Sequence, residues 1–160
     1  MPMSQTRNRA GRNLWLALGA INGLLAVALG AYAAHGLRGR LLAGDLNVFE
    51  IGVHYQGLHA LALVAVGILS RIGGESRWLK WSGWAFFLGI LIFSGSLYAL
   101  VMSGWRGLGI ITPFGGLLFL LGWLLLVFEA WGSSSGQIAK AAPRPRPASR
   151  PRDKGQDSLD

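Results

Sequence analysis

The sequence predicts an all-α integral membrane protein, in which four transmembrane helices form a bundle and a disordered basic tail follows at the C-terminus. The 160 residues are 52% hydrophobic and only 14% charged, which is too little charge to cover a soluble domain of this length. Four apolar stretches are long enough to cross a bilayer of roughly 30 Å at the α-helical rise. The spans are expected at 14–34, 55–72, 81–103 and 110–131, between a cytoplasmic basic N-terminus (1–13) and a Pro/Arg-rich tail (132–160).

The basic residues predict the orientation of these spans. Twelve of the fifteen Lys and Arg residues fall in the N-terminus, the loop after the second span and the tail, whereas Arg38, Arg40 and Arg106 fall on the other side. Positively charged segments are retained in the cytoplasm, so both termini are expected there. The net charge of +8 is therefore explained by membrane topology, and no nucleic acid is expected as a partner.

The first span also has features of a signal peptide. A basic start and an apolar core precede Ala31-Tyr32-Ala33, which fits a small-residue cleavage site. The apolar core is longer than the ~7–15 residues usual for a signal peptide. We therefore expect the segment to be retained as the first transmembrane helix.

The tail from 132 to 160 differs in composition from the membrane domain. Its last part, PRPRPASRPRDKGQDSLD, has no aromatic residue and cannot bury enough apolar surface to offset the entropy of an ordered chain. We expect a disordered segment that helps to fix topology, and contact with anionic lipid headgroups is the alternative. The chain has no cysteine, which excludes disulfides and thiolate metal sites.

Small residues predict where the helices pack closely. In the first span, small side chains recur on one helical face at Gly19, Gly23, Ala26, Gly30 and Ala33. Such a stripe lets a second backbone approach, and close packing of this kind drives helix association in lipid. The other spans carry small residues at Ala60, Gly67, Gly89, Gly95, Gly115, Gly116 and Gly122.

Polar side chains are predicted to gather in the half of the bundle away from the termini. The candidate ligand-binding residues are His35, Glu50, His54, Tyr55, Gln56, His59, Ser94, Ser96 and Thr112. Glu50 and His54 share one helical face, and Tyr55 and His59 share the next. Asn47 followed by Glu50 resembles a capping box and suggests that the second helix starts in the preceding loop. We expect a pocket lined by His35, His59, Ser96 and Thr112.

Three chemistries are compatible with this cluster. His35 and His59 could ligate a haem or a metal ion, but a metal site would need a third ligand, for which only Glu50 or His54 is at hand. The polar groups could instead hydrogen-bond to one another and join the helices, or recognise a lipid headgroup or small solute. No nucleophile–base pair, phosphate loop or carboxylate dyad is present, so we assign no catalytic residue and expect no cofactor or bound metal.

Four segments resemble signatures of a known family. They are LGAYAAHGLRGRL, FEIGVHYQGLHALALVAVGIL, FSGSLYAL and ITPFGGLLFLLGWLLL, and their order and spacing are similar to those of the domain-of-unknown-function 423 family. That family includes bacterial inner-membrane proteins and the eukaryotic transmembrane protein 256. The resemblance covers about 14–128, and Ala34 stands where the family more usually has glycine. It implies a four-span protein of the bacterial inner membrane, but brings no established activity.

Two classes of function therefore remain open. The first is a non-enzymatic multi-pass membrane protein, either an accessory subunit or a bundle that binds a small ligand or lipid. The second is a haem- or metal-bearing component of a membrane oxidoreductase that uses His35 and His59. A transporter is a third, less favoured idea, because four spans would need to oligomerise to form a path. The expected partners are the lipid bilayer, other membrane proteins and, through the tail, anionic headgroups.

Overall fold

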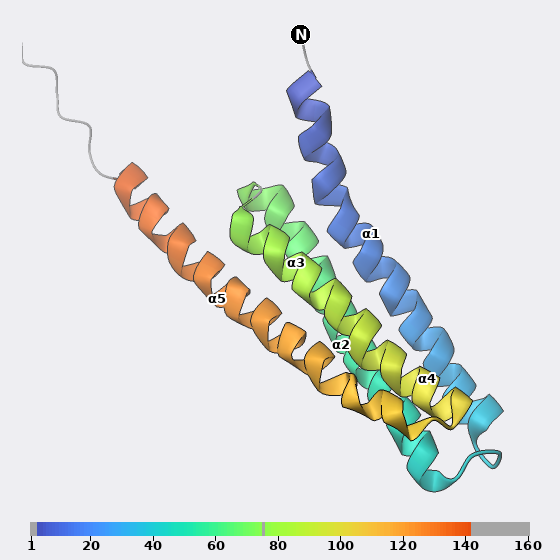
Figure 1. Ribbon diagram of the computed structural model, residues 1–160. Coiled ribbons are helices and arrows are strands. Elements are labelled where there is room, and N and C mark those ends of the chain that lie inside the picture. Colours follow the sequence, from blue (N-terminus) through green and yellow to red (C-terminus); the bar gives the residue numbers. More distant parts are fainter. Residues whose placement is uncertain (1–2, 75, 142–160) are drawn as a thin grey trace, which may run out of the picture.

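Four long helical rods run side by side in this protein (Figure 1). The structure is a computed structural model that describes residues 3–74 and 76–141, with side chains over 14–74 and 76–132. Most of the described residues lie in helices, and none lies in a strand. In chain order the elements are α1 (Met3–Tyr32), η1 (Ala33–Leu37), α2 (Ala43–Gly73), α3 (Arg77–Gly89), η2 (Ile90–Ser94), α4 (Gly95–Ser103), η3 (Arg106–Ile110) and α5 (Thr112–Ala141).

Each rod is long and apolar enough to cross a membrane. The four candidate spans in the described part of the chain are Leu14–Leu37, Ala43–Gly73, Arg77–Ser103 and Arg106–Gly132. The predicted four-helix membrane architecture is therefore confirmed. The third rod is made of three segments, because the π-helix η2 joins α3 to α4 without a break in direction.

The helices extend beyond the spans predicted for them. α2 begins at Ala43, so the capping box predicted at Asn47 is wrong: this residue lies inside the helix. α5 continues to Ala141 and so includes the first part of the segment predicted to be disordered, and α1 likewise begins at Met3, inside the basic N-terminus. A helix can outlast its apolar segment because backbone hydrogen bonds propagate at little cost once a nucleus exists. The rest of the predicted tail, 142–160, lies outside the described residues.

The turn between α2 and α3 shows how the sequence ends one rod and starts the next. Gly74 follows α2 with a φ of 87°, a left-handed conformation that glycine adopts without steric cost. Ser76 then caps α3, because its Oγ accepts a hydrogen bond from the N–H of Leu79 at 3.1 Å. The same hydroxyl donates to the carboxylate of Glu129 on α5. The turn is therefore tied to the last rod.

The rods pack in a row that leaves α1 and α5 on opposite sides (Figure 1). α1 packs along α2, and α2 packs on the third rod through α3, η2 and α4. α5 packs on α3 and η2 rather than along α2. The start of α1, the α2–α3 turn and the end of α5 share one end of the bundle, which we call the termini end. Arg106 and Asp45 form an ion pair of 2.7 Å at the opposite end.

Two apolar clusters fill the bundle, and polar side chains lie between them. The cluster nearer the termini end includes Leu63 and Phe86, and the other includes Phe49 and Leu100. Between them along the rods lie buried polar residues, which we call the middle polar layer: Asn22, Gln56, His59, Ser94 and Ser96. These five residues lie at mid-length, and Ser70 and Ser82 are buried nearer the termini end, so the buried polar groups are not confined to the half away from the termini as the sequence suggested.

Candidate functional site

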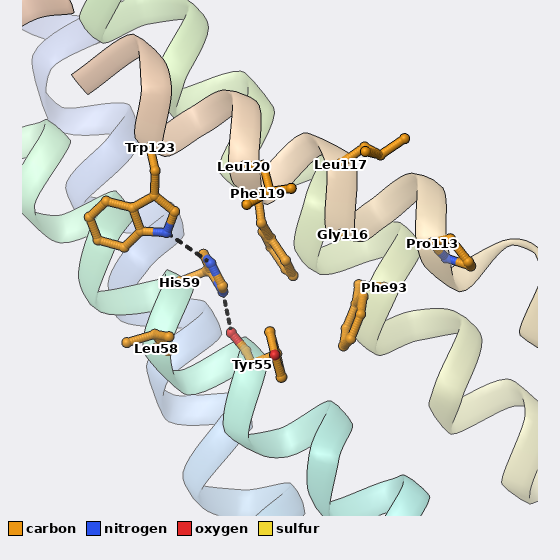
Figure 2. A pocket seen from close by; sticks show the side chains of 10 residues that line it. All are labelled: Tyr55, Leu58, His59, Phe93, Pro113, Gly116, Leu117, Phe119, Leu120 and Trp123. Atoms are coloured by element: carbon orange, nitrogen blue, oxygen red, sulfur yellow. Dashed lines mark hydrogen bonds between the residues drawn. The ribbon is translucent and has the colours of Figure 1, made fainter. Parts of the chain in front are cut away.

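An open groove runs between α2 and α5, with η2 at its base (Figure 2). Its volume is about 480 Å³. The lining residues are mostly apolar or aromatic: Tyr55, Leu58, His59, Phe93, Pro113, Gly116, Leu117, Phe119, Leu120 and Trp123. Leu120 is 68% exposed, and this exposed side faces lipid when the rods span a bilayer. The groove is therefore a lateral opening in the membrane domain.

Glycines on α3 and α5 explain why this groove exists. A Cβ at Gly89 would lie 2.6 Å from the ring of Phe119, and one at Gly122 would lie 2.5 Å from the ring of Phe86. A Cβ at Gly115 would collide with the backbone of Phe93. α5 is thereby drawn against α3 and η2. Its other side faces α2 across the groove, where only large side chains bridge the space.

His59 is the buried polar residue of the groove, with 2% of its surface exposed. Its Nδ1 lies 2.8 Å from the carbonyl oxygen of Tyr55, one helical turn earlier. A carbonyl only accepts, so Nδ1 carries the proton and Nε2 has the lone pair. The indole N–H of Trp123 on α5 donates to this Nε2 at 3.3 Å (Figure 2). Both imidazole nitrogens are therefore engaged, and the ring is held in its neutral form.

Aromatic rings surround this imidazole. The ring of Phe119 stacks on His59 with 3.5 Å between centroids and 5° between planes. The ring of Tyr55 lies beside both of these rings, 6.0 Å from His59 and 6.1 Å from Phe119, and also contacts Phe93 at 4.6 Å. A tilted pair such as Tyr55 and Phe93 contributes about 0.5–1.5 kcal/mol beyond burial of its area. The groove is thus lined by rings fixed in position on α2, η2 and α5.

A second polar group lies deeper in the bundle, away from the groove. The hydroxyl of Tyr98 on α4 donates to Oε1 of Gln56 at 2.8 Å, and the Gln56 amide donates to the carbonyl of Asn22 at 3.3 Å. The Asn22 side chain in turn donates to the carbonyl of Leu18 at 2.8 Å. This Asn22–Gln56–Tyr98 network links three rods. Its partners are all within the protein, so it can join helices but offers no open ligand position.

Two serines complete the middle polar layer. Ser96 lies 2.8 Å from the hydroxyl of Thr112, and it also donates to the carbonyl of Phe93 at 2.9 Å. This contact joins the third rod to the first turn of α5. Ser94 is 1% exposed, and its hydroxyl is without a hydrogen-bond partner among the described residues. Ser94 ends the π-helix η2, a type of segment that often occurs at functional sites.

The sequence matches the family described as "Protein of unknown function (DUF423)" over residues 29–116. The chain belongs to the DUF423 family. UPF0382 membrane proteins of Staphylococcus aureus and Staphylococcus saprophyticus are 46% and 48% identical over 118 and 114 residues. These matches cover 74% and 71% of this chain and 95% and 93% of the relatives. No solved structure matches the chain.

The family membership confirms the resemblance inferred from the signature segments. Together with the four apolar rods, it makes this DUF423 protein a multi-pass protein of the cell membrane. The family match includes Tyr55, His59 and Phe93 of the groove, but it ends at Gly116. The part of the α5 wall that contains Phe119 and Trp123 thus lies beyond the family match.

The structure separates His35 from His59. His35 is exposed in η1, and its neighbours Ala33 and Leu37 pack with Phe49 of α2. His59 lies ten residues further along α2, which is about 15 Å at the α-helical rise. The predicted pocket of His35, His59, Ser96 and Thr112 is therefore wrong as a single site. The reason is the early start of α2, which carries His59 to mid-length.

Other candidate residues are likewise divided between sites. Glu50 and His54 are exposed on α2, and no group of three potential metal ligands occurs among the described residues. Tyr55 and His59 line the groove, whereas Gln56 faces the Asn22–Gln56–Tyr98 network. Their positions follow from helical geometry, because residues four apart share a face and adjacent residues do not.

Some of the glycines predicted to pack against another helix do so, and others do not. A Cβ at Gly19 would meet α2 within 3 Å, one at Gly67 would meet Leu16 of α1 at 2.6 Å, and Gly30 approaches Val53 more loosely. Gly115 and Gly116 face Phe93. A Cβ at Gly23 or Gly95 would meet no atom within 4 Å, so the structure gives these two glycines no packing role. Sequence reasoning did not single out Gly52 and Gly83, which receive the rings of Tyr98 and Trp15.

Sequence reasoning also missed the α5 wall of the groove. Phe119 and Trp123 lie four residues apart and therefore share a helical face, a spacing that is visible in the sequence. In an apolar span, however, most faces are apolar, and the pattern does not show which one meets another helix. The contact with His59 becomes apparent only when α2 and α5 are set side by side.

Proposed function

We propose that this DUF423 protein is a non-enzymatic membrane protein that binds a small lipophilic molecule in the groove between α2 and α5. The observation that carries the proposal is the groove itself, an aromatic cleft that opens sideways at mid-length of the membrane domain. Its volume of about 480 Å³ falls in the range of roughly 300–1,000 Å³ typical of small-molecule sites.

The exposed rim of the groove supports entry from the bilayer. Leu117 and Leu120 are 62% and 68% exposed on the side that faces lipid. A lipophilic molecule could therefore reach the aromatic base by lateral diffusion, without crossing a polar surface. A water-soluble ligand would have to be desolvated to enter a groove of this composition.

The state of His59 favours binding over catalysis or metal ligation. Its Nε2 lone pair accepts from Trp123, and its Nδ1 proton is donated to the carbonyl of Tyr55. A metal ion or haem iron would have to displace the indole, and proton transfer would have to break one of the two hydrogen bonds. We therefore propose that the protein works without a resident haem or metal ion.

Retention of a lipophile by the purified protein tests the proposal. Gly116→Leu places a bulky side chain in the groove, where a Cβ would lie 3.8 Å from the Phe93 ring and so fits without collision. Native mass spectrometry of protein extracted in mild detergent should show a small molecule bound to the wild type and absent from this variant. Gly23→Leu is the matched control, because a Cβ there meets no atom within 4 Å. Equal retention by all three proteins would contradict the proposal.

A further inference from the structure

One hydrogen-bond donor in the groove is unused. The hydroxyl of Tyr55 makes no hydrogen bond to any residue that the structure describes, and Tyr55 lines the groove with 39% of its surface exposed, so a ligand can reach it. The ring nitrogens of His59 and the indole N–H of Trp123 are already engaged: Nε2 accepts from Trp123, and Nδ1 donates to the carbonyl of Tyr55. A phenol in an apolar setting loses free energy when its hydroxyl has no partner. The groove therefore matches a ligand that brings a hydrogen-bond acceptor to Tyr55.

The lack of basic residues in the groove lining argues against an anionic lipid headgroup as the ligand. None of the residues that line the groove is Lys or Arg, so a phosphate or carboxylate would enter without a counter-charge. Placing an unpaired charge at this depth is costly. A phospholipid headgroup is therefore a poor occupant.

A bare acyl chain is a poor occupant for a different reason. It would fill the volume between Leu117 and Leu120, but it would leave the Tyr55 hydroxyl without an acceptor. It would also gain little from the aromatic rings, which bind flat partners best through offset stacking. The ring of Phe93, which lines the groove 4.6 Å from the ring of Tyr55, offers such a surface.

We infer that the ligand of this groove is a lipophile with a flat, carbonyl-bearing ring of the quinone class. This inference rests on the proposed function and names its ligand class. The ligand ring lies against Phe93, and a ring carbonyl accepts a hydrogen bond from the Tyr55 hydroxyl. The aliphatic chain leaves the groove past Leu117 and Leu120 into the bilayer. The inference concerns binding alone and involves no electron transfer.

The test uses the full-length protein in detergent and a decyl-substituted benzoquinone as the probe. Quinones quench tryptophan fluorescence, and Trp123 lies in the groove, so binding should appear as saturable quenching. Tyr55→Phe keeps the ring and removes only the hydroxyl, and it should weaken binding about five- to tenfold. Tyr98→Phe is the matched control: it removes a phenol hydroxyl that is bonded to Gln56 outside the groove, so quinone affinity should stay unchanged.

A competition experiment tests the quinone assignment independently of whether the groove binds any lipophile. Decylbenzene has the ring and the chain but no carbonyl, and an equal concentration of it should displace little quinone. If decylbenzene competes as well as the quinone, or if Tyr55→Phe binds the quinone as tightly as the wild type, the quinone assignment is wrong. The groove would still bind a lipophile, and Gly116→Leu would abolish binding. If quenching is not saturable and Gly116→Leu also has no effect on retained mass, both proposals fail.

Discussion

Individual residues decide how closely α1 can approach α2. Gly19 is the tightest point of this contact, because an added Cβ would lie 2.8 Å from the backbone nitrogen of Val64 and 2.9 Å from the carbonyl of Ala60. Backbone atoms cannot move aside as the end of a flexible side chain can. Gly23, one turn later on the predicted stripe, has no neighbour within 4 Å. A stripe read from sequence therefore overstates the number of contacts.

This difference predicts unequal effects of two matched substitutions. Gly19→Ala should lower the free energy of unfolding by about 1–3 kcal/mol, the usual range for overpacking. Gly23→Ala should be neutral or slightly stabilising, because alanine is the better helix former. Both variants are unfolded in the same detergent, and the loss of the helical circular dichroism signal gives the change in the free energy of unfolding for each. Equal destabilisation would show that Gly19 is not a point of backbone contact.

At the scale of elements, the sequence predicts each rod but not its register. Apolar length reveals all four spans, because a bilayer requires such length whatever the packing. The start of the second span depends instead on the loop after η1: it lies at Ala43 and not at residue 55. A difference of twelve residues corresponds to about 18 Å along a helix, which displaces the predicted depth of His59. The sequence therefore predicted the groove residues Tyr55 and His59 on α2, but not the residues of η2 and α5 that face them.

The π-helix η2 is an element that the sequence did not predict. A π segment inserts one residue into a helix, so it changes which side chains face a neighbouring rod. In this protein Phe93 lines the groove while the next residue, Ser94, is buried in the middle polar layer. No residue pattern in ILIFS distinguishes this turn from an ordinary apolar helix.

The Asn22–Gln56–Tyr98 network predicts coupling between rods. Removing the Tyr98 hydroxyl leaves Oε1 of Gln56 buried and unpaired, so a second change at Gln56 should cost less than it does alone. A double-mutant cycle of Tyr98→Phe with Gln56→Leu should give a coupling of about 0.6–1.7 kcal/mol, as for other intramembrane hydrogen bonds. Unfolding in detergent supplies the four free energies.

Tyr32→Phe with Gln56→Leu is the control cycle. Tyr32 is 48% exposed and makes no hydrogen bond to Gln56 in the described structure. Its cycle should be additive within about 0.3–0.5 kcal/mol. Additivity of the Tyr98 cycle as well would mean that the network does not join α2 to α4 energetically.

At the scale of the whole molecule, the helices bring more basic residues to the termini end, where α1 also carries Arg7, Arg9 and Arg12, than to the opposite end. Arg71, Arg77 and Lys80 flank the α2–α3 turn at the termini end. Exposed Arg38 and Arg40 lie at the opposite end, together with Arg106, which pairs with Asp45. Basic residues close to span ends determine orientation by remaining in the cytoplasm. We therefore propose that the termini end faces the cytoplasm.

Reporter fusions test this orientation. Green fluorescent protein is fluorescent in the cytoplasm, and alkaline phosphatase is active only outside it. Fused after Ala141, green fluorescent protein should be fluorescent and alkaline phosphatase inactive. Inserted at Gly39, between η1 and α2, green fluorescent protein should be dark and alkaline phosphatase active. Gly74 is the matched control, because its turn lies at the termini end and should agree with Ala141. Phosphatase activity at Ala141 and Gly74, with fluorescence at Gly39, would reverse the orientation and show that the basic residues do not determine it.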